Sequence, residues 1–187
     1  MAKFVLPGQG ESGDQHLVCC NQSGILIAAI DGIGHGEEAA NAAKAAVAVL
    51  KAGSEEPVIS LLERCHEELR ATRGVVLSLA SIEPEHGMMT WAGVGNVQGA
   101  LMRNGAKKGN VQEVLLLRGG VVGSQLPALQ AAVLPVAKGI HWYLLRMGFE
   151  VILPKVFPRW NLRKGRRTRS SNSIAAEMTT RWYWWRG

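Results

Sequence analysis

The chain has 187 residues, of which 47% are hydrophobic and 19% are charged, which is typical of a soluble globular protein. This length suits one ordinary domain with a hydrophobic core. No uncharged apolar stretch reaches the roughly 18 residues needed to span a bilayer, and residues 1–8 lack the apolar core of a secretory signal. We therefore expect a cytoplasmic protein with no membrane partner.

The net charge of +6 is unevenly distributed along the chain. Residues 1–139 hold 11 basic and 13 acidic side chains, a net charge of −2, whereas residues 140–187 hold 10 basic and 2 acidic ones, a net charge of +8. The positive charge is thus confined to the last quarter of the chain, and it does not indicate a nucleic-acid-binding domain.

The first predicted element is a β-hairpin. Two short apolar runs, residues 17–20 and 25–30, flank the sequence Asn-Gln-Ser-Gly, whose residue types favour a turn. The second strand ends at Asp31, because Gly32 and Gly34 interrupt the apolar run.

Two helices are predicted next. The Ala-rich run 37–52 has strong helix propensity, and Gly53 can end it. A second helix is predicted over 57–70, because its apolar residues recur at spacings of three and four along one face.

Four strand-like runs, separated by Gly, Pro and Asn, follow the helices at residues 75–82, 88–94, 99–103 and 113–117. They predict an antiparallel meander. Two strands, two helices and then several strands is the order of an α+β fold in which helices cover a β-sandwich. Strands and helices do not alternate as they do in a parallel βαβ fold.

The chain contains two aspartates, Asp14 and Asp31, and each lies next to glycine. Mg²⁺ and Mn²⁺ prefer carboxylate, carbonyl and water oxygens, so an aspartate at a strand end followed by glycine can offer its side chain and a nearby backbone carbonyl. Asp-Gly is also a common turn sequence. On spacing alone, both interpretations stay open.

The surrounding motifs resemble a known family. Ser-Gly-Asp at residues 12–14, Asp-Gly-Ile-Gly-His-Gly at residues 31–36 and Glu-Ala-Ala at residues 38–40 resemble the opening of the SpoIIE-like phosphatases of the protein phosphatase 2C (PPM) class. Within it, the small phosphatases of the bacterial stressosome, a stress-signalling complex, look most similar. Trp-Ala-Gly-Val-Gly-Asn-Val at 91–97 and Gly-Gly-Val-Val-Gly at 119–123 resemble later motifs of that branch. The resemblance covers residues 1–139.

This resemblance implies an αββα sandwich, with two antiparallel sheets flanked by helices, and a two-metal site for Mn²⁺ or Mg²⁺. It implies that Asp31 bridges both ions, that the Gly32 carbonyl binds one of them and that Asp14 contributes from the other side. Water activated by the ions would attack the phosphorus. His35 can donate a hydrogen bond to the phosphate or act as a general acid beside the following helix, or it can simply shape the glycine loop.

Two later aspartates of the family pattern are missing, and the composition changes at Ile140. Five of the six tryptophans lie in residues 140–187. Because Trp and Met have single codons, the alternative frame can be partly read: 178–187 allows Asp-Asp-Ala followed by an apolar strand, and 139–148 allows a strand ending in Asp-Gly. We therefore hypothesise that 1–139 is a truncated phosphatase domain, incomplete at its C-terminus, and that 140–187 is translated out of frame.

Three functions follow from these observations. The first is a metal-dependent protein serine/threonine phosphatase, with STAS-domain proteins of the stressosome as the substrates that the resemblance implies. The second is a catalytically dead pseudophosphatase that still binds its partner, because the missing aspartates leave the metal site incomplete. The third is a basic Trp-containing tail that binds nucleic acid through phosphate contacts and stacking. It is disfavoured because an out-of-frame tail would be basic only by accident of the frame.

Overall fold

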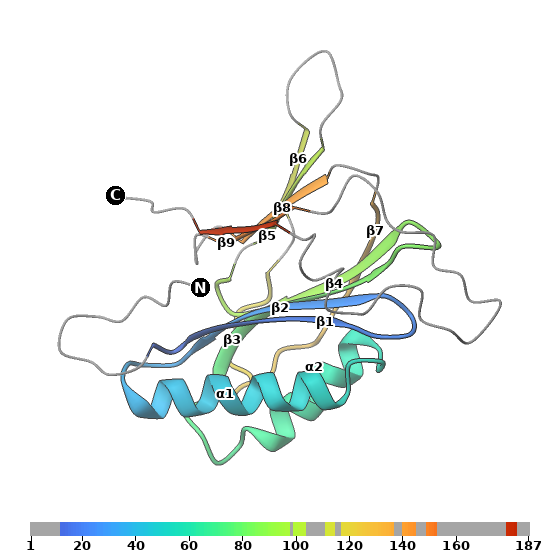
Figure 1. The fold of residues 1–187 in the computed structure, drawn as a ribbon. Helices are drawn as coiled ribbons and strands as arrows, with labels where there is room; N and C mark the ends of the chain where they lie inside the picture. The colour runs from blue at the N-terminus through green and yellow to red at the C-terminus, as the bar shows by residue number, and fades with distance from the viewer. Residues whose placement is uncertain are drawn as a thin grey trace.

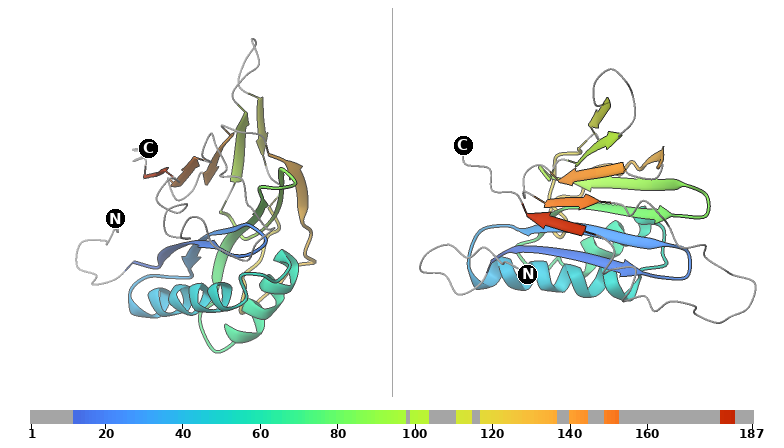
Figure 2. Two further views of the ribbon diagram at one scale, coloured as in Figure 1. Left: turned by 45° about the vertical axis from the view of Figure 1, so that its right-hand side comes forward. Right: turned by 45° about the horizontal axis from the view of Figure 1, so that its top comes forward.

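The computed structural model describes residues 12–97, 99–103, 111–114, 117–136, 140–144, 149–152 and 179–182. These residues form three layers: a pair of helices, a first sheet and a second sheet (Figure 1). Both helices cover one face of the first sheet, and the second sheet lies over its other face. Two further views show the same order of layers (Figure 2).

The first sheet is antiparallel, with the strand order β1-β2-β3-β4-β7. Its strands are β1 (Asp14–Cys20), β2 (Ile25–Gly32), β3 (Val75–Glu83), β4 (Met88–Val94) and β7 (Ala132–Pro135). Strand β2 lies between β1 and β3 and is almost entirely buried, whereas β1 is an edge strand. The end of β2 is therefore held on both sides by hydrogen-bonded neighbours.

The second sheet has the order β10-β9-β8-β5-β6 and is also antiparallel. Its strands are β5 (Gly99–Arg103), β6 (Val111–Val114), β8 (Ile140–Leu144), β9 (Phe149–Ile152) and β10 (Thr179–Trp182). Three of these strands, β8, β9 and β10, come from the segment that we hypothesise to be out of frame. Its boundary at residue 139 stays a prediction.

Helices α1 (Glu37–Ala52) and α2 (Val58–Glu68) bury their apolar faces against the first sheet. The buried face of α1 consists mainly of alanines, which lets the helix approach the strands closely. From the sheet, the alternate residues Leu26, Ala28 and Ile30 of β2 point toward the helices. This packing fixes the start of α1 against the end of β2.

The other face of the first sheet carries a second apolar cluster. Ile25, Ile27 and Ala29 alternate with the helix-facing residues of β2 and belong to this cluster. Trp91, on β4, lies in the same cluster and donates a hydrogen bond from Nε1 to Ser78 Oγ at 2.8 Å. Ser78 is the buried polar residue of the described core, and this bond satisfies it.

The predicted fold class is confirmed for the layers that the structure describes. Strands at 75–83, 88–94 and 99–103 and the helices match their predicted positions within two residues. The meander prediction is wrong beyond β4, because the chain leaves the first sheet and β5 pairs with β6 and β8. Strand β6 begins two residues earlier than predicted, and none of the described residues forms a helix on the second sheet.

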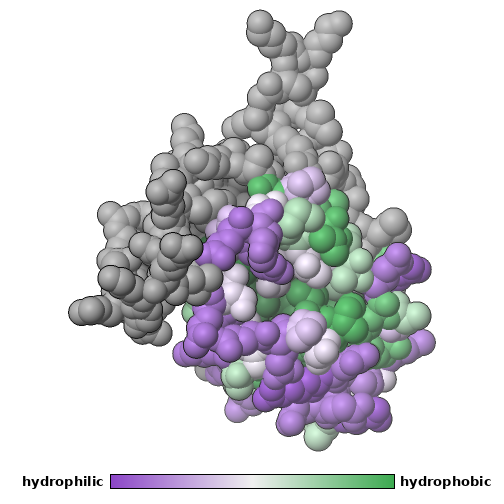
Figure 3. All heavy atoms as spheres, turned by 90° about the vertical axis from the view of Figure 1, so that its right-hand side faces the viewer, coloured by the Kyte–Doolittle hydropathy of each residue, from purple (hydrophilic) through white to green (hydrophobic). Residues whose placement is uncertain are grey.

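Hydrophilic residues cover much of the described surface, with hydrophobic residues between them (Figure 3). Val133, on the edge strand β7, is 60% exposed and is the large hydrophobic residue that stands out in the described part. Within the described ranges, no helix is long and apolar enough to cross a membrane. The three cysteines are free thiols.

Candidate metal centre

The two aspartates of the chain are brought together by the first strand pair. Asp14 is the Cα partner of Asp31 in the antiparallel pair of β1 and β2. Directly opposite residues in such a pair point to the same face, with Cβ atoms about 4.5–5.5 Å apart. Asp31 follows Ala29 at a spacing of two. Both carboxylates therefore lie on the face of the first sheet that is opposite the helices and carries the second apolar cluster. The geometry places the two side chains opposite each other, and their role as metal ligands stays a prediction.

Backbone hydrogen bonds fix the two aspartates in place. The Asp14 N–H donates to Ser12 Oγ at 3.1 Å, which closes the turn before β1. The Gly32 N–H donates to the Gly13 carbonyl oxygen at 3.1 Å and extends the pairing of the two chain segments. The residues before Asp14 and after Asp31 are therefore tied to each other directly.

Gly32 allows α1 to start immediately above this pair. A Cβ atom at position 32 would lie 2.1 Å from the Ala39 carbonyl oxygen, far inside van der Waals contact. That oxygen belongs to the backbone of α1, so no side-chain rotation can relieve the overlap. The glycine after Asp31 is thus required by the approach of helix to strand, whatever its carbonyl binds.

The donor set suits a hard divalent cation. Two half-buried carboxylates and the neighbouring Gly32 carbonyl offer oxygen atoms, the type of ligand that Mg²⁺ and Mn²⁺ prefer. Across the ranges that the structure describes, no three or more His, Cys, Asp and Glu side chains come together as a metal-binding group. The described residues therefore bring together the two predicted carboxylates and no third one.

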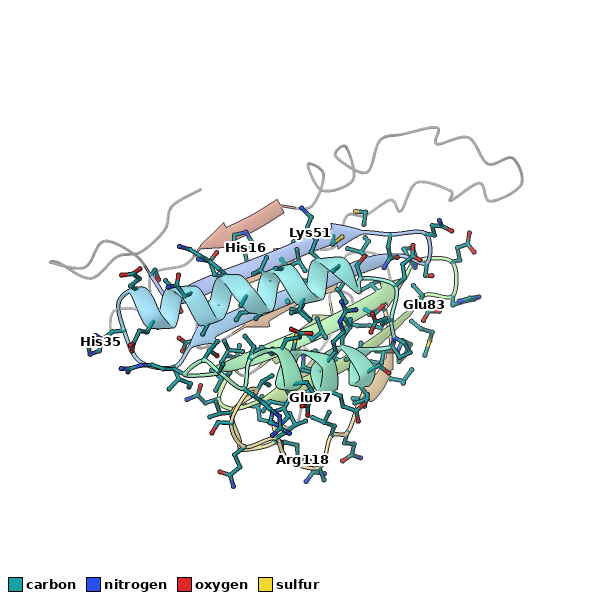
Figure 4. All side chains as sticks on the ribbon, turned by 90° about the horizontal axis from the view of Figure 1, so that it is seen from below. His16, His35, Lys51, Glu67, Glu83 and Arg118 are labelled. Carbon is teal, nitrogen blue, oxygen red and sulfur yellow. The ribbon has the colours of Figure 1, made fainter. Side chains whose placement is uncertain are left out.

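His35 lies on the loop between β2 and α1 and is exposed (Figure 4). Its role as a hydrogen-bond donor to the phosphate, or as a general acid, stays a prediction. His16 occupies the same face of β1 as Asp14, two residues along the strand, and is half-buried. The sequence analysis began this strand at residue 17, so the alternation that places His16 beside Asp14 was missed.

A second residue that the sequence analysis missed is Arg73, two residues before the start of β3. Its guanidinium forms an ion pair with Glu38 in the first turn of α1. It also lies against Gly34, where an added Cβ would be 3.0 Å from Arg73 Nη1. The signal in the sequence was weak: a single Arg-Gly between a helix and a strand. Its proximity to the glycine loop depends on contacts between distant segments.

The fold is shared with a known class of protein. The PP2C phosphatase domain of the SpoIIE protein of Bacillus subtilis superposes with a TM-score of 0.56 at 15% identity, covering 81% of this chain and 42% of that one. The described part of the chain has the fold of the PP2C-type phosphatases, the class to which the SpoIIE-like enzymes belong.

Within this class, the sequence resembles RsbX. Phosphoserine phosphatase RsbX of Bacillus subtilis (strain 168) is 29% identical over 91 residues, which cover 49% of this chain and 46% of that protein. The match therefore spans about half the length of this relative. No family model matches the chain. The predicted resemblance to SpoIIE-like phosphatases is confirmed.

Two solved structures agree with this resemblance. One, from work on the bacterial stressosome as a modular system adapted to control secondary messenger signalling, superposes with a TM-score of 0.67 at 29% identity, covering 80% of this chain and 72% of that one. RsbX in complex with magnesium superposes with a TM-score of 0.68 at 22% identity, covering 94% of this chain and 85% of that one.

Proposed function

We propose that the chain is a metal-dependent phosphatase that removes phosphate from phosphoserine and phosphothreonine residues of proteins. The observation that carries this proposal is the direct pairing of Asp14 with Asp31 at the end of β2, on the sheet face opposite the helices. The resemblance to a phosphoserine phosphatase supports the same activity.

In this proposal, Asp14, Asp31 and the Gly32 carbonyl hold Mg²⁺ or Mn²⁺. The bound ions lower the pKa of water and offset negative charge on the phosphoryl oxygens. The pairing of β1 with β2 sets the spacing of the two carboxylates, and the close packing of α1 on Gly32 fixes the turn that follows Asp31. His35, exposed on that loop, donates to the phosphate or, alternatively, only shapes the loop.

We further propose that the substrates are phosphorylated STAS-domain proteins of the stressosome and that the protein acts in the cytoplasm. Two similarities support this substrate class: the curated relative RsbX, and the structure determined in work on the bacterial stressosome. In this proposal the basic residues of 140–187 contribute no nucleic-acid binding, because they lie in the segment that we hypothesise to be out of frame.

A second function, a pseudophosphatase that binds its partner without hydrolysis, is favoured by one observation. The chain has two aspartates in total, and the described residues bring no third His, Cys, Asp or Glu side chain together with them as a metal-binding group. A single weak ion site would leave phosphate binding intact and remove turnover. The two functions therefore differ in catalysis and not in recognition.

The test is Mn²⁺-dependent hydrolysis of a phosphoserine protein and of an aryl phosphate by the full chain. Asp31→Asn should lower kcat/KM at least about 100-fold. Loss of a residue that only supports a metal ligand costs up to about 100-fold in activity, and loss of the ligand itself should cost no less. Glu85→Gln, the matched control, removes one exposed carboxylate at the opposite end of β3 and should leave the rate unchanged. Equal rates in the wild type and Asp31→Asn would refute the proposed metal site.

A version with the alternative frame restored after residue 139 completes this test. Hydrolysis by the chain as written, lost in Asp31→Asn, would mean that the Asp14 and Asp31 half of the site is sufficient. Hydrolysis only in the restored version would favour the pseudophosphatase for this chain. The nucleotide sequence tests the frame itself, since the shifted frame should read through as an uninterrupted phosphatase sequence.

A further inference from the structure

Among the described residues, Arg73 is a cationic side chain that contacts the glycine loop after Asp31. We propose that Arg73 is a substrate-binding residue that contacts the phosphate group, and that Glu38 occupies its guanidinium when no substrate is bound. This inference rests on the proposed phosphatase function and adds to it a specificity-determining pair that the family resemblance does not supply.

Arg73 is positioned by its backbone. Thr72 Oγ1 donates to the Leu69 carbonyl oxygen at 2.7 Å and accepts from the Gly74 N–H at 3.0 Å, so the residues on both sides of Arg73 are fixed. The Gly74 carbonyl oxygen in turn accepts from the Ile33 N–H at 3.0 Å, which ties this segment to the loop after Asp31. The base of the Arg73 side chain is therefore held beside the glycine loop.

The side chain then crosses that loop. Arg73 Nη1 would lie 3.0 Å from a Cβ at position 34, and its Cδ and Cζ would lie 3.7 and 3.9 Å away. Gly34 has a φ of +98°, a backbone conformation that favours glycine. The absence of a side chain at this position also leaves room for the guanidinium. Gly34 follows Asp31 by three residues, a span of at most about 10 Å. Arg73 thus contacts the same loop that begins after Asp31.

The charges at this end of the sheet explain why an arginine is needed. The first turn of α1 adds two carboxylates, those of Glu37 and Glu38, beside the two aspartates whose charge the proposed metal ions would offset. Arg73 is the cationic side chain that contacts the loop among them. Its planar guanidinium can donate two parallel hydrogen bonds to phosphate, which a lysine ammonium cannot do.

Glu38 is a weak competitor for this guanidinium. The side chains of Arg73 and Glu38 are 53% and 67% exposed, and exposed ion pairs add little stability. A phosphate dianion carries more charge than one carboxylate and can exchange with Glu38 at little cost. The pair can therefore keep the guanidinium oriented over the glycine loop and release it when the phosphate binds.

If Glu38 and phosphate exchange on Arg73, substitutions at the two residues should change phosphate affinity in opposite directions. Arg73→Ala should weaken binding of phosphate, whereas Glu38→Gln should strengthen it, because the competing charge is removed. If the pair only held the loop to the helix, both variants would break the same contact and weaken binding together. Arg73→Lys keeps the charge without the planar fork and should fall between Arg73→Ala and the wild type.

The experiment measures binding without turnover. A fluorescein-labelled peptide with a phosphonate analogue of phosphoserine is titrated with the full chain in Mn²⁺ by fluorescence anisotropy, and the same peptide with serine is the reference. Arg73→Ala should reduce the preference for the phosphonate peptide about tenfold or more, as loss of charge-assisted hydrogen bonds predicts. Glu38→Gln should increase that preference. Thermal unfolding of each variant checks that the fold is intact.

The outcomes separate this inference from the proposed function. Opposite shifts in the two variants support the role of Arg73 whether or not the chain hydrolyses the substrate. Shifts in the same direction, or no preference for the phosphonate peptide in the wild type, overturn it even if hydrolysis depends on Asp31. Should Arg73→Ala fail to fold, the sign of the Glu38→Gln shift still decides the question.

Discussion

The close packing of α1 on the strand that carries Asp31 can be tested by one methyl group. Gly32→Ala would place Cβ at 2.1 Å from the Ala39 carbonyl oxygen, 2.7 Å from its carbonyl carbon and 3.0 Å from its Cα. Ordinary carbon–oxygen contact needs more than 3 Å, so the helix start and the strand end must separate by about 1 Å. Every atom in the way is backbone, which means that the movement shifts the whole first turn of α1.

The expected cost is that of overpacking a dense core, about 1–3 kcal/mol of unfolding free energy. The same displacement moves the turn after Asp31, so Mn²⁺ affinity should fall together with stability. Urea unfolding followed by circular dichroism measures the first quantity, and calorimetric titration with Mn²⁺ measures the second. Both should change in the same variant.

Gly119→Ala is the matched control. A Cβ at position 119 would meet no atom within 4 Å, and its φ is not in the left-handed region. This variant should stay within about 0.5 kcal/mol of the wild type, as surface substitutions usually do. If Gly32→Ala were as stable as Gly119→Ala, the contact between α1 and the end of β2 would not be as close as described, and our account of Gly32 would be refuted.

Two further predictions concern buried groups. Ser78→Ala removes the acceptor of the Trp91 indole N–H, so the unfolding free energy should fall by about 1–3 kcal/mol; an unchanged urea midpoint would contradict this. Burial raises the pKa of the Cys65 thiol from 9.0 to about 12. Between these values the unfolded chain loses this proton and the folded chain keeps it, so stability should fall as pH rises, by at most about 1.4 kcal/mol per unit. Cys65→Ala should remove this component, and parallel stability–pH curves for the two proteins would contradict it.

Local patterns were sufficient to predict the first half of the fold. The apolar run up to Asp31, broken by Gly32, placed the end of β2 to within one residue, and the alanines of 37–52 gave α1 its bounds. These features are encoded within a few residues of each other. Strand β1 was started three residues late because Asp14 and His16 are polar, and pairing with β2 overrides their low strand propensity.

Features that depend on distant contacts were not predictable in this way. Strand β7 is short and contains Pro135, which is tolerated because the strand lies at the edge of its sheet. Strand β5 pairs with β8 across a long segment of chain, so its own sequence does not say which sheet it joins. For the candidate site, the resemblance predicted the two aspartates, but the contact of Arg73 with Glu38 and Gly34 required the folded chain.

The two aspartates are not held equally by the fold. Asp31 is the second-to-last residue of a strand that has hydrogen-bonded neighbours on both sides, whereas Asp14 is the first residue of an edge strand. Terminal residues of edge strands open locally at a lower free-energy cost than the centre of a sheet. A ligand that needs both carboxylates can therefore bind only while the start of β1 is paired with β2. Its apparent affinity is then set as much by the preorganisation of the β1 terminus as by the carboxylates themselves.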